Sequence, residues 1–145
     1  MIRYELVNPA DQMDGVRELL ALNWEETGFD YEFNPSKEMY QAAVDAGMMF
    51  AMAAFDGTRM IGYCTMLIHP HLHNPKIIMA SNDALFVHPS YRGITGARLI
   101  RNVEQEASRR GAKRVMWHTR SGTSLHLAMQ RHGYTPTDIV MMKEI

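Results

Sequence analysis

Residues Val87–Ala97 carry the pattern with the clearest chemical meaning in this sequence. After Pro89 the chain reads Ser-Tyr-Arg-Gly-Ile-Thr-Gly-Ala, a turn with two glycines that opens directly into a segment with helical apolar spacing. The first amide groups of a helix have no acceptor within the helix, and the helix dipole adds partial positive charge there. The pattern therefore predicts a phosphate or pyrophosphate site, with an ordinary glycine-containing loop as the alternative.

Asp83 is the candidate acid or base nearest to this turn. It stands between Asn82 and Ala84 in a largely apolar run, on the same predicted strand face as Leu85 and Val87. A carboxylate in such a run is unfavourable to bury without a partner or a purpose. Two interpretations stay open: a general base, or a structural residue that caps a β-bulge or pairs with an arginine.

The segment 69–75 contains three alternating histidines, His69, His71 and His73. On a strand this spacing would place all three on one face, where they could bind zinc. Two prolines interrupt the segment, and no acid or cysteine accompanies the histidines. We expect a solvated loop and no metal, with a small zinc-binding protein as the alternative.

Apolar periodicity and turn residues predict the elements that position these groups. The predicted strands are Ile2–Val7, Met48–Phe55, Arg59–Ile68, Lys76–Val87, Arg114–Thr119 and Tyr134–Glu144. The predicted helices are a segment from about Asp11 to Thr27, then Ser36–Ala46, Gly96–Arg110 and Thr123–His132. Asp56-Gly57 between two apolar runs is typical of a tight hairpin turn.

The element order β-α-α-β-β-β-α-β-α-β predicts an α+β fold, in other words a mixed α/β arrangement. A strand, a crossover helix and a strand over residues 77–119 imply a parallel pair, 77–87 with 114–119, joined to an otherwise antiparallel sheet. A chain of 145 residues suits a single domain, here 1–145.

Composition narrows the classes of partner. The formal net charge of −1 gives no reason to expect nucleic acid, and no apolar run approaches the roughly 20 residues that a membrane span needs. The first residues do not resemble a signal peptide, and a single cysteine, Cys64, excludes an internal disulfide. We therefore expect a cytoplasmic protein without a membrane partner.

The charge is unevenly distributed along the chain. Residues 1–91 hold 5 Lys and Arg against 12 Asp and Glu, whereas residues 92–145 hold 10 against 4. The basic excess begins at Arg92, beside the predicted anion-binding turn. A polyanionic ligand near Arg92 is one explanation, and solvated helix faces are the other.

The strand end, Val-His-Pro-x-Tyr-Arg-Gly, the turn and the following helix together resemble the acetyl-CoA signature of the GNAT superfamily of N-acetyltransferases. The core pattern of that signature is Arg/Gln-x-x-Gly-x-Gly/Ala. Arg92 and Ala97 match its first and last positions, whereas Thr95 stands where the middle glycine is usual and Gly96 follows one place later. The stretch 124–134 resembles the final helix of the family and its Gly-aromatic exit, and the element order covers essentially the whole chain.

This resemblance implies an N-acetyltransferase in which a primary amine attacks the thioester of acetyl-CoA directly, in a gap between the two parallel strands and without a metal. The main chain around Leu85, Phe86 and Val87 would hold the pantetheine arm and stabilise the oxyanion. The cofactor pyrophosphate would lie against the turn formed by Arg92, Gly93, Ile94, Thr95, Gly96 and Ala97.

The resemblance also implies catalytic roles. Asp83 lies four residues before Val87, where the family often has an acid near the acceptor amine, so we expect it to be the base. The tyrosine that often serves as general acid is replaced by Met129. Tyr134 becomes the candidate acid, with Tyr91, a water or no acid as alternatives, because a thiolate with a pKa of about 8.5 can leave unaided.

The acceptor is expected to be a small-molecule amine, or a lysine or N-terminal amine of a protein. In this family the segments 23–35 and 69–75 would line the acceptor side. The first of them is acidic and suits a cation such as a polyamine or an aminoglycoside, through Glu25, Glu26, Asp30 and Glu32. A homodimer is possible, and a non-catalytic acyl-CoA sensor or partner-binding module with the same fold is the alternative function.

Overall fold

The computed structural model describes residues 1–14, 16–28 and 30–145. One five-stranded sheet contains β1 (Ile2–Val7), β2 (Met49–Asp56), β3 (Arg59–His71), β4 (Asn74–Val87) and β5 (Ala112–Met116), in that spatial order. The helices are α1 (Pro9–Gln12), α2 (Arg17–Thr27), α3 (Lys37–Asp45), α4 (Ile94–Arg109) and α5 (Ser124–Arg131), with a 3₁₀ turn η1 (Pro89–Tyr91). All strand pairs are antiparallel except β4–β5, which confirms the predicted α+β fold and its parallel pair.

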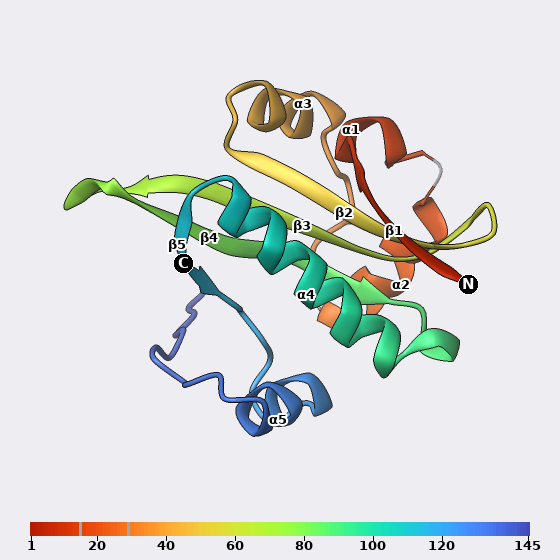
Figure 1. Cartoon of the computed structure of the whole chain (residues 1–145). Helices are drawn as coiled ribbons and strands as arrows, with labels where there is room; N and C mark the ends of the chain where they lie inside the picture. The colour runs from red at the N-terminus through yellow and green to blue at the C-terminus, as the bar shows by residue number, and fades with distance from the viewer. Residues whose placement is uncertain (15, 29) are drawn as a thin grey trace.

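Helices cover both faces of the sheet (Figure 1). On one face α4 crosses the strands and buries Leu99, Val103 and Ala107 completely, since residues at i, i+4 and i+8 share one side of a helix. On the other face Leu19 of α2 packs with Tyr63 and Phe86. None of the helices that the structure describes is long and apolar enough to cross a membrane.

The predicted loop at 69–75 is wrong, because β3 runs to His71 and β4 begins at Asn74. β2 begins at Met49, which pairs with Leu67, so the residues of β3 after Ile68 have no strand neighbour on that side. Ile68 directs its amide toward this side, to Met48 O at 2.8 Å, and Pro70 shares that direction two residues later. Its missing N–H therefore removes no ladder bond, as is usual for proline at a sheet edge.

The first predicted helix is divided into α1 and α2. Asn8 caps α1 by accepting a hydrogen bond from the Ala10 amide, and Pro9 occupies its first position, where a missing N–H is harmless. Gly15, which lies outside the described residues, stands between the two helices in the sequence, and glycine is an unfavourable helix residue. The described residues between β1 and β2 therefore form three helices, one more than predicted.

The predicted final strand, Tyr134–Glu144, is not formed. The apolar residues of this segment are solvent-exposed, with Ile139 at 87 % and Met142 at 83 %. A strand is stable only with a hydrogen-bonded neighbour, and the sheet ends at β5, which does not pair with the segment.

Candidate functional site

The two parallel strands β4 and β5 separate partway along their length. Their ladder begins at Ile78 with Ala112 and ends at Ser81 with Met116. β4 continues to Val87, so its second half has no neighbour on the β5 side. The observed strand β5 (Ala112–Met116) begins and ends earlier in the chain than the predicted strand Arg114–Thr119. The gap expected between the two parallel strands is present.

Asn82 spans the gap at the point where the strands separate. Its Nδ2 donates to the main-chain oxygen of His118 at 3.2 Å, and its Oδ1 accepts from the His118 amide at 2.6 Å. One side-chain amide thus replaces the main-chain ladder, which explains why residues 117–119 are not a strand. Nothing in the sequence indicated this role, because the two partners are 36 residues apart.

Asn82→Ala is expected to raise the KM for acetyl-CoA several-fold and to lower the free energy of unfolding by about 1–2 kcal/mol, because two hydrogen bonds at the origin of the gap are lost. Initial-rate kinetics and thermal unfolding measure the two effects. Asn102→Ala is the matched control, since among the described residues the Asn102 side chain hydrogen-bonds to Arg98 O alone, on the exposed side of α4. Equal KM values for the two variants would contradict the positioning role of Asn82.

The open edge of β4 offers main-chain groups to the gap. The His88 amide donates to Ile61 O of β3 at 2.8 Å. Successive residues of a strand alternate in direction, so Leu85 and Val87 direct their N–H and C=O groups toward the gap. Phe86 directs its own toward β3, where it pairs with Tyr63. Of the three residues expected to hold the pantetheine arm, two therefore face the gap with their main chain.

The turn before α4 presents amide groups at the end of the gap. Gly93 has φ 96° and ψ −116°, a conformation that side chains other than glycine rarely adopt, and it caps the helix. The amides of Ile94, Thr95 and Gly96 belong to the first helical turn and have no acceptor within it. The Ala97 amide differs from them, because it already donates to Gly93 O at 3.1 Å.

Thr95, the residue that departs from the usual glycine, points into the protein. It is 5 % exposed, and the hydroxyl of Tyr4 donates to its main-chain oxygen at 3.4 Å. Because the side chain is directed away from the open front of the turn, the amides stay accessible to an anion. The departure from the signature is therefore accommodated by packing against β1.

The Arg92 side chain is held by contacts with β4 and α2 and does not extend freely from the turn. Its Nε donates to Val87 O at 3.0 Å, and its Nη2 lies 2.5 Å from Glu26 Oε1. The guanidinium also lies over the Phe86 ring, 5.5 Å from the centroid. Arg92 thus connects the end of β4 to α2, with Glu26 as its ion-pair partner.

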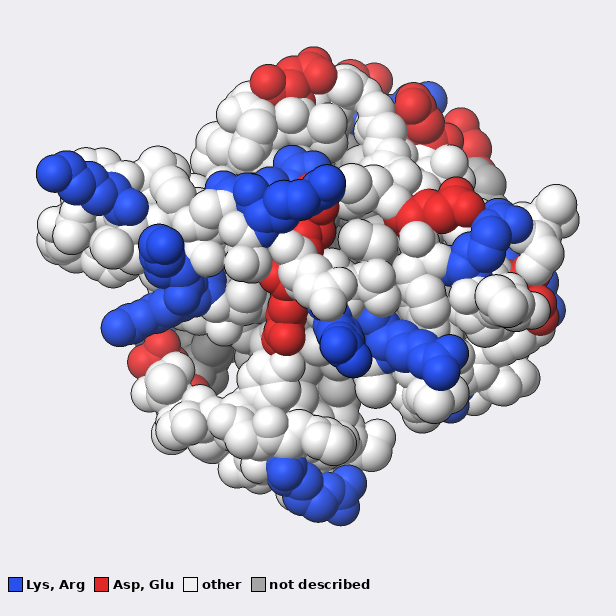
Figure 2. Space-filling view, viewed as in Figure 1, with Lys and Arg blue, Asp and Glu red and all other residues white. Residues whose placement is uncertain are grey.

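Positive charge gathers on the face that carries α4 (Figure 2). Arg109 and Arg110, at the end of the helix, both bind Glu106, which is 7 % exposed. Arg98 and Arg101 are exposed nearer the turn and form no ion pair with any described residue. These two arginines strengthen the attraction of the turn for a polyanion.

A β-bulge determines where Asp83 points. Thr65 of β3 pairs with Ala84 and Met66 pairs with Asn82, so Asp83 is the extra residue of β4. The bulge turns its side chain to the α2 face, away from Leu85, and the predicted shared strand face is wrong. The Thr65 hydroxyl donates to Asp83 Oδ2 at 2.9 Å and accepts from the Ala84 amide at 3.1 Å.

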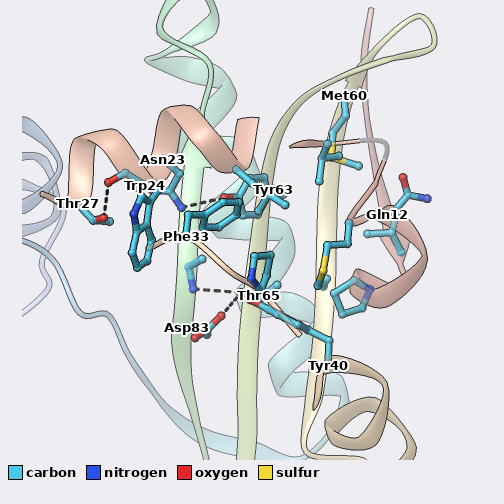
Figure 3. A pocket seen from close by; sticks show the side chains of 18 residues that line it. Gln12, Asn23, Trp24, Thr27, Phe33, Tyr40, Met60, Tyr63, Thr65 and Asp83 are labelled. Atoms are coloured by element: carbon cyan, nitrogen blue, oxygen red, sulfur yellow. Dashed lines mark hydrogen bonds between the residues drawn. The ribbon is translucent and has the colours of Figure 1, made fainter. Parts of the chain in front are cut away.

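Asp83 lines a cavity of about 220 Å³ between the sheet and helices α1–α3 (Figure 3). Most of the lining side chains are apolar, including Leu20, Trp24, Phe33, Pro35, Ala51 and Met60. Tyr40 faces the carboxylate: burial, followed by the charge of Asp83 and a hydrogen bond to it, raises the pKa of Tyr40 to about 12. Tyr40 therefore keeps its proton and can donate it in a hydrogen bond to Asp83.

The sequence model of the acetyltransferase (GNAT) family matches residues 14–134. The chain belongs to this family. No functionally curated protein sequence matches it.

Solved structures show the same fold at low sequence identity. An aminoglycoside acetyltransferase from an uncultured soil metagenomic sample, in complex with sisomicin, has 14 % identity and a TM-score of 0.78 over 99 % of this chain and 95 % of its own. A ribosomal-protein-alanine N-acetyltransferase from Brucella melitensis biovar Abortus 2308 has 13 % identity and a TM-score of 0.74 over 100 % and 99 %. A predicted acetyltransferase from Clostridium acetobutylicum, solved with acetyl-CoA, has 15 % identity and a TM-score of 0.73 over 99 % and 96 %.

Tyr134 lies apart from Asp83 in this GNAT protein. Its hydroxyl donates to Glu104 Oε1 of α4 at 2.5 Å, and Trp117 Nε1 donates to the same oxygen at 2.9 Å. Burial, then the hydrogen bond to Glu104 and its charge, raises the pKa of Tyr134 above its usual value. These contacts favour a structural role for Tyr134, and Met129 fills the usual acid position as a buried side chain.

The remaining candidate residues lie outside the cavity. Glu25, Asp30 and Glu32 are exposed and do not line it. His71 and His73 lie beside each other near the tip of the β3–β4 hairpin, with ring centroids 5.6 Å apart. Among the described residues no cluster of three histidines, cysteines or acids could hold a metal ion.

Proposed function

We propose that this protein is an N-acetyltransferase that moves the acetyl group of acetyl-CoA to a primary amine by direct attack. The observation that carries the proposal is the bulge of β4, which aims Asp83 into an apolar cavity at the residue after Asn82. Asn82 is where β4 and β5 separate. A carboxylate thus lies beside the gap in which the family places its thioester.

The proposed acetyl-CoA site runs from the turn before α4 along the open edge of β4. The amides of Ile94, Thr95 and Gly96 would bind the pyrophosphate, supported by the helix dipole and the exposed arginines of α4. The main-chain groups of Leu85 and Val87 would hold the pantetheine arm. One of these amides would stabilise the oxyanion that forms at the thioester carbonyl.

The reaction transfers two protons in addition to the acetyl group. The amine binds as an ammonium ion beside Asp83, which accepts a proton directly or through one water and passes it to solvent. The neutral nitrogen attacks the carbonyl carbon to give a tetrahedral intermediate whose nitrogen still carries one extra proton. The nitrogen releases this second proton to solvent, the oxyanion collapses, and the carbon–sulfur bond breaks. The coenzyme A thiolate leaves and takes a proton from solvent, so the products are an amide and free coenzyme A.

No side-chain acid is needed in this scheme. A thiol has a pKa of about 8.5, so its thiolate is an adequate leaving group at neutral pH. Met129 cannot donate a proton, and the Tyr134 hydroxyl is bound to Glu104. We therefore propose Asp83 as the one catalytic side chain and assign Tyr134 a supporting role between α5 and α4.

Turnover tests this proposal. The protein is incubated with acetyl-CoA and a broad panel of amines, free thiol is followed continuously, and acetylated products are identified by mass spectrometry. We expect amine-dependent thiol release with one acetyl group per product. Tight binding of acetyl-CoA without turnover on any amine would instead establish an acyl-CoA sensor, a function that the buried Met129 favours.

A further inference from the structure

The cavity beside Asp83 combines one negative charge with apolar walls. Asp83 is the single charged side chain among the described residues that line it. Part of the wall is aromatic, because Phe33 packs against Trp24 with ring centroids 5.5 Å apart and both line the cavity. Such a site recognises a ligand with one cationic group and an apolar body, since the carboxylate neutralises one charge and the walls release water from the rest.

The volume of the cavity limits the size of that body. An apolar protein cavity of about 150 Å³ is large enough to hold benzene. A cavity of about 220 Å³ therefore accommodates a six-membered ring with a short aminoalkyl arm, or an unbranched chain of similar size. An aminoglycoside with several sugar rings is too large to be enclosed in it.

The charges outside the cavity do not favour a polycation either. Of the acids on the segment 23–35, Glu26 is paired with Arg92, and the other three project into solvent. Inside the cavity an additional ammonium group would meet apolar side chains and neutral polar ones such as Gln12 and Asn23, but no second carboxylate among the described lining residues to neutralise it. Burying such an uncompensated charge is unfavourable. The polyamine and aminoglycoside acceptors expected from the acidity of this segment are therefore disfavoured.

We infer that the acceptor is a small primary monoamine with an apolar body, such as an arylalkylamine or a short alkylamine, bound with its ammonium group at Asp83. This inference rests on the proposed acetyltransferase function. The Thr65 hydroxyl donates to the carboxylate at 2.9 Å and fixes its orientation toward the apolar cavity, which Tyr40 also lines. The aromatic pair of Trp24 and Phe33 encloses the body of the amine.

Four probe amines test the inference: 2-phenylethylamine, hexylamine, spermidine and sisomicin, together with a peptide that has a free N-terminus and a lysine. We expect kcat/KM for the first two to exceed that for each of the others by at least tenfold. Higher kcat/KM for spermidine, sisomicin or the peptide would overturn the inference while leaving acetyl transfer established. No thiol release with any amine would refute the proposed function itself.

Phe33→Ala examines the cavity wall directly. Removing the ring is expected to raise the KM for 2-phenylethylamine about tenfold, with little change in kcat or in the KM for acetyl-CoA. Tyr31→Ala is the matched control, because Tyr31 also contacts Trp24, at 5.3 Å between centroids, but does not line the cavity. An equal rise in KM for both variants would show that the loop and not the cavity wall determines binding, and would overturn the inference.

Discussion

Asp83→Asn is expected to lower kcat by at least about 100-fold, the usual contribution of a general base, with little change in the affinity for acetyl-CoA. Asparagine has the shape of aspartate, and its side-chain oxygen can accept the hydrogen bond from the Thr65 hydroxyl, so the bulge is retained. The variant loses only the ability to take a proton from the amine. Steady-state kinetics and calorimetric titration with coenzyme A separate the two effects.

The pH dependence distinguishes a missing base from a damaged fold. Without Asp83 only the neutral form of the amine reacts, and that form increases tenfold per pH unit below an amine pKa of about 10. The residual rate of Asp83→Asn should therefore rise steadily with pH. Tyr40 does not complicate this profile, since burial, the largest cause of its raised pKa, is unchanged in the variant and keeps the pKa above its usual value.

Asp45→Asn is the matched control for this experiment. Asp45 is an exposed acid at the end of α3, hydrogen-bonded to Gln41, and it does not line the cavity. Its substitution should leave kcat unchanged. A kcat for Asp83→Asn within threefold of the wild-type value would exclude Asp83 as the base and leave a water in that role.

Gly93→Ala is expected to weaken coenzyme A binding by at least about tenfold. The φ of 96° is strained for any residue with a Cβ, and such strain costs about 1–3 kcal/mol when the conformation is retained. The turn can relieve it only by rotating the peptide planes that lead into α4, which redirects the amides proposed to bind the pyrophosphate. Calorimetric titration with coenzyme A measures the loss.

Gly57→Ala separates strain from binding. Gly57 also has positive φ, 58°, and an added Cβ has no atom within 4 Å, as at Gly93. It lies in the β2–β3 turn, away from the gap, so its substitution should lower thermal stability without changing coenzyme A affinity. Unaltered binding by Gly93→Ala would show that the turn is not the pyrophosphate site.

The signals that succeeded in the sequence are local ones. Asp56-Gly57 between two apolar runs predicted the β2–β3 hairpin. Apolar spacing predicted α4, although its fully buried face contains Leu99 with Val103 and Ala107, and not the expected Ile100. The predictions failed where the structure of a segment depends on whether a neighbouring strand pairs with it. Pro70 lies in a strand because β2 does not extend beside it, and the segment after α5 is not a strand because β5 does not pair with it.

The features of the candidate site also fall into those that a local sequence pattern predicts and those that depend on contacts between distant residues. The sequence by itself determined the turn at Gly93 that opens a helix, and it singled out Asp83. A glycine-containing connection before a helix and a carboxylate in an apolar run can both be recognised from neighbouring residues alone. Only the tertiary structure decided that Asp83 faces α2, that Asn82 spans the gap to His118, and that the acids of the segment 23–35 lie outside the cavity. These depend on a one-residue shift in strand register and on contacts between residues far apart in the chain, which no local pattern encodes.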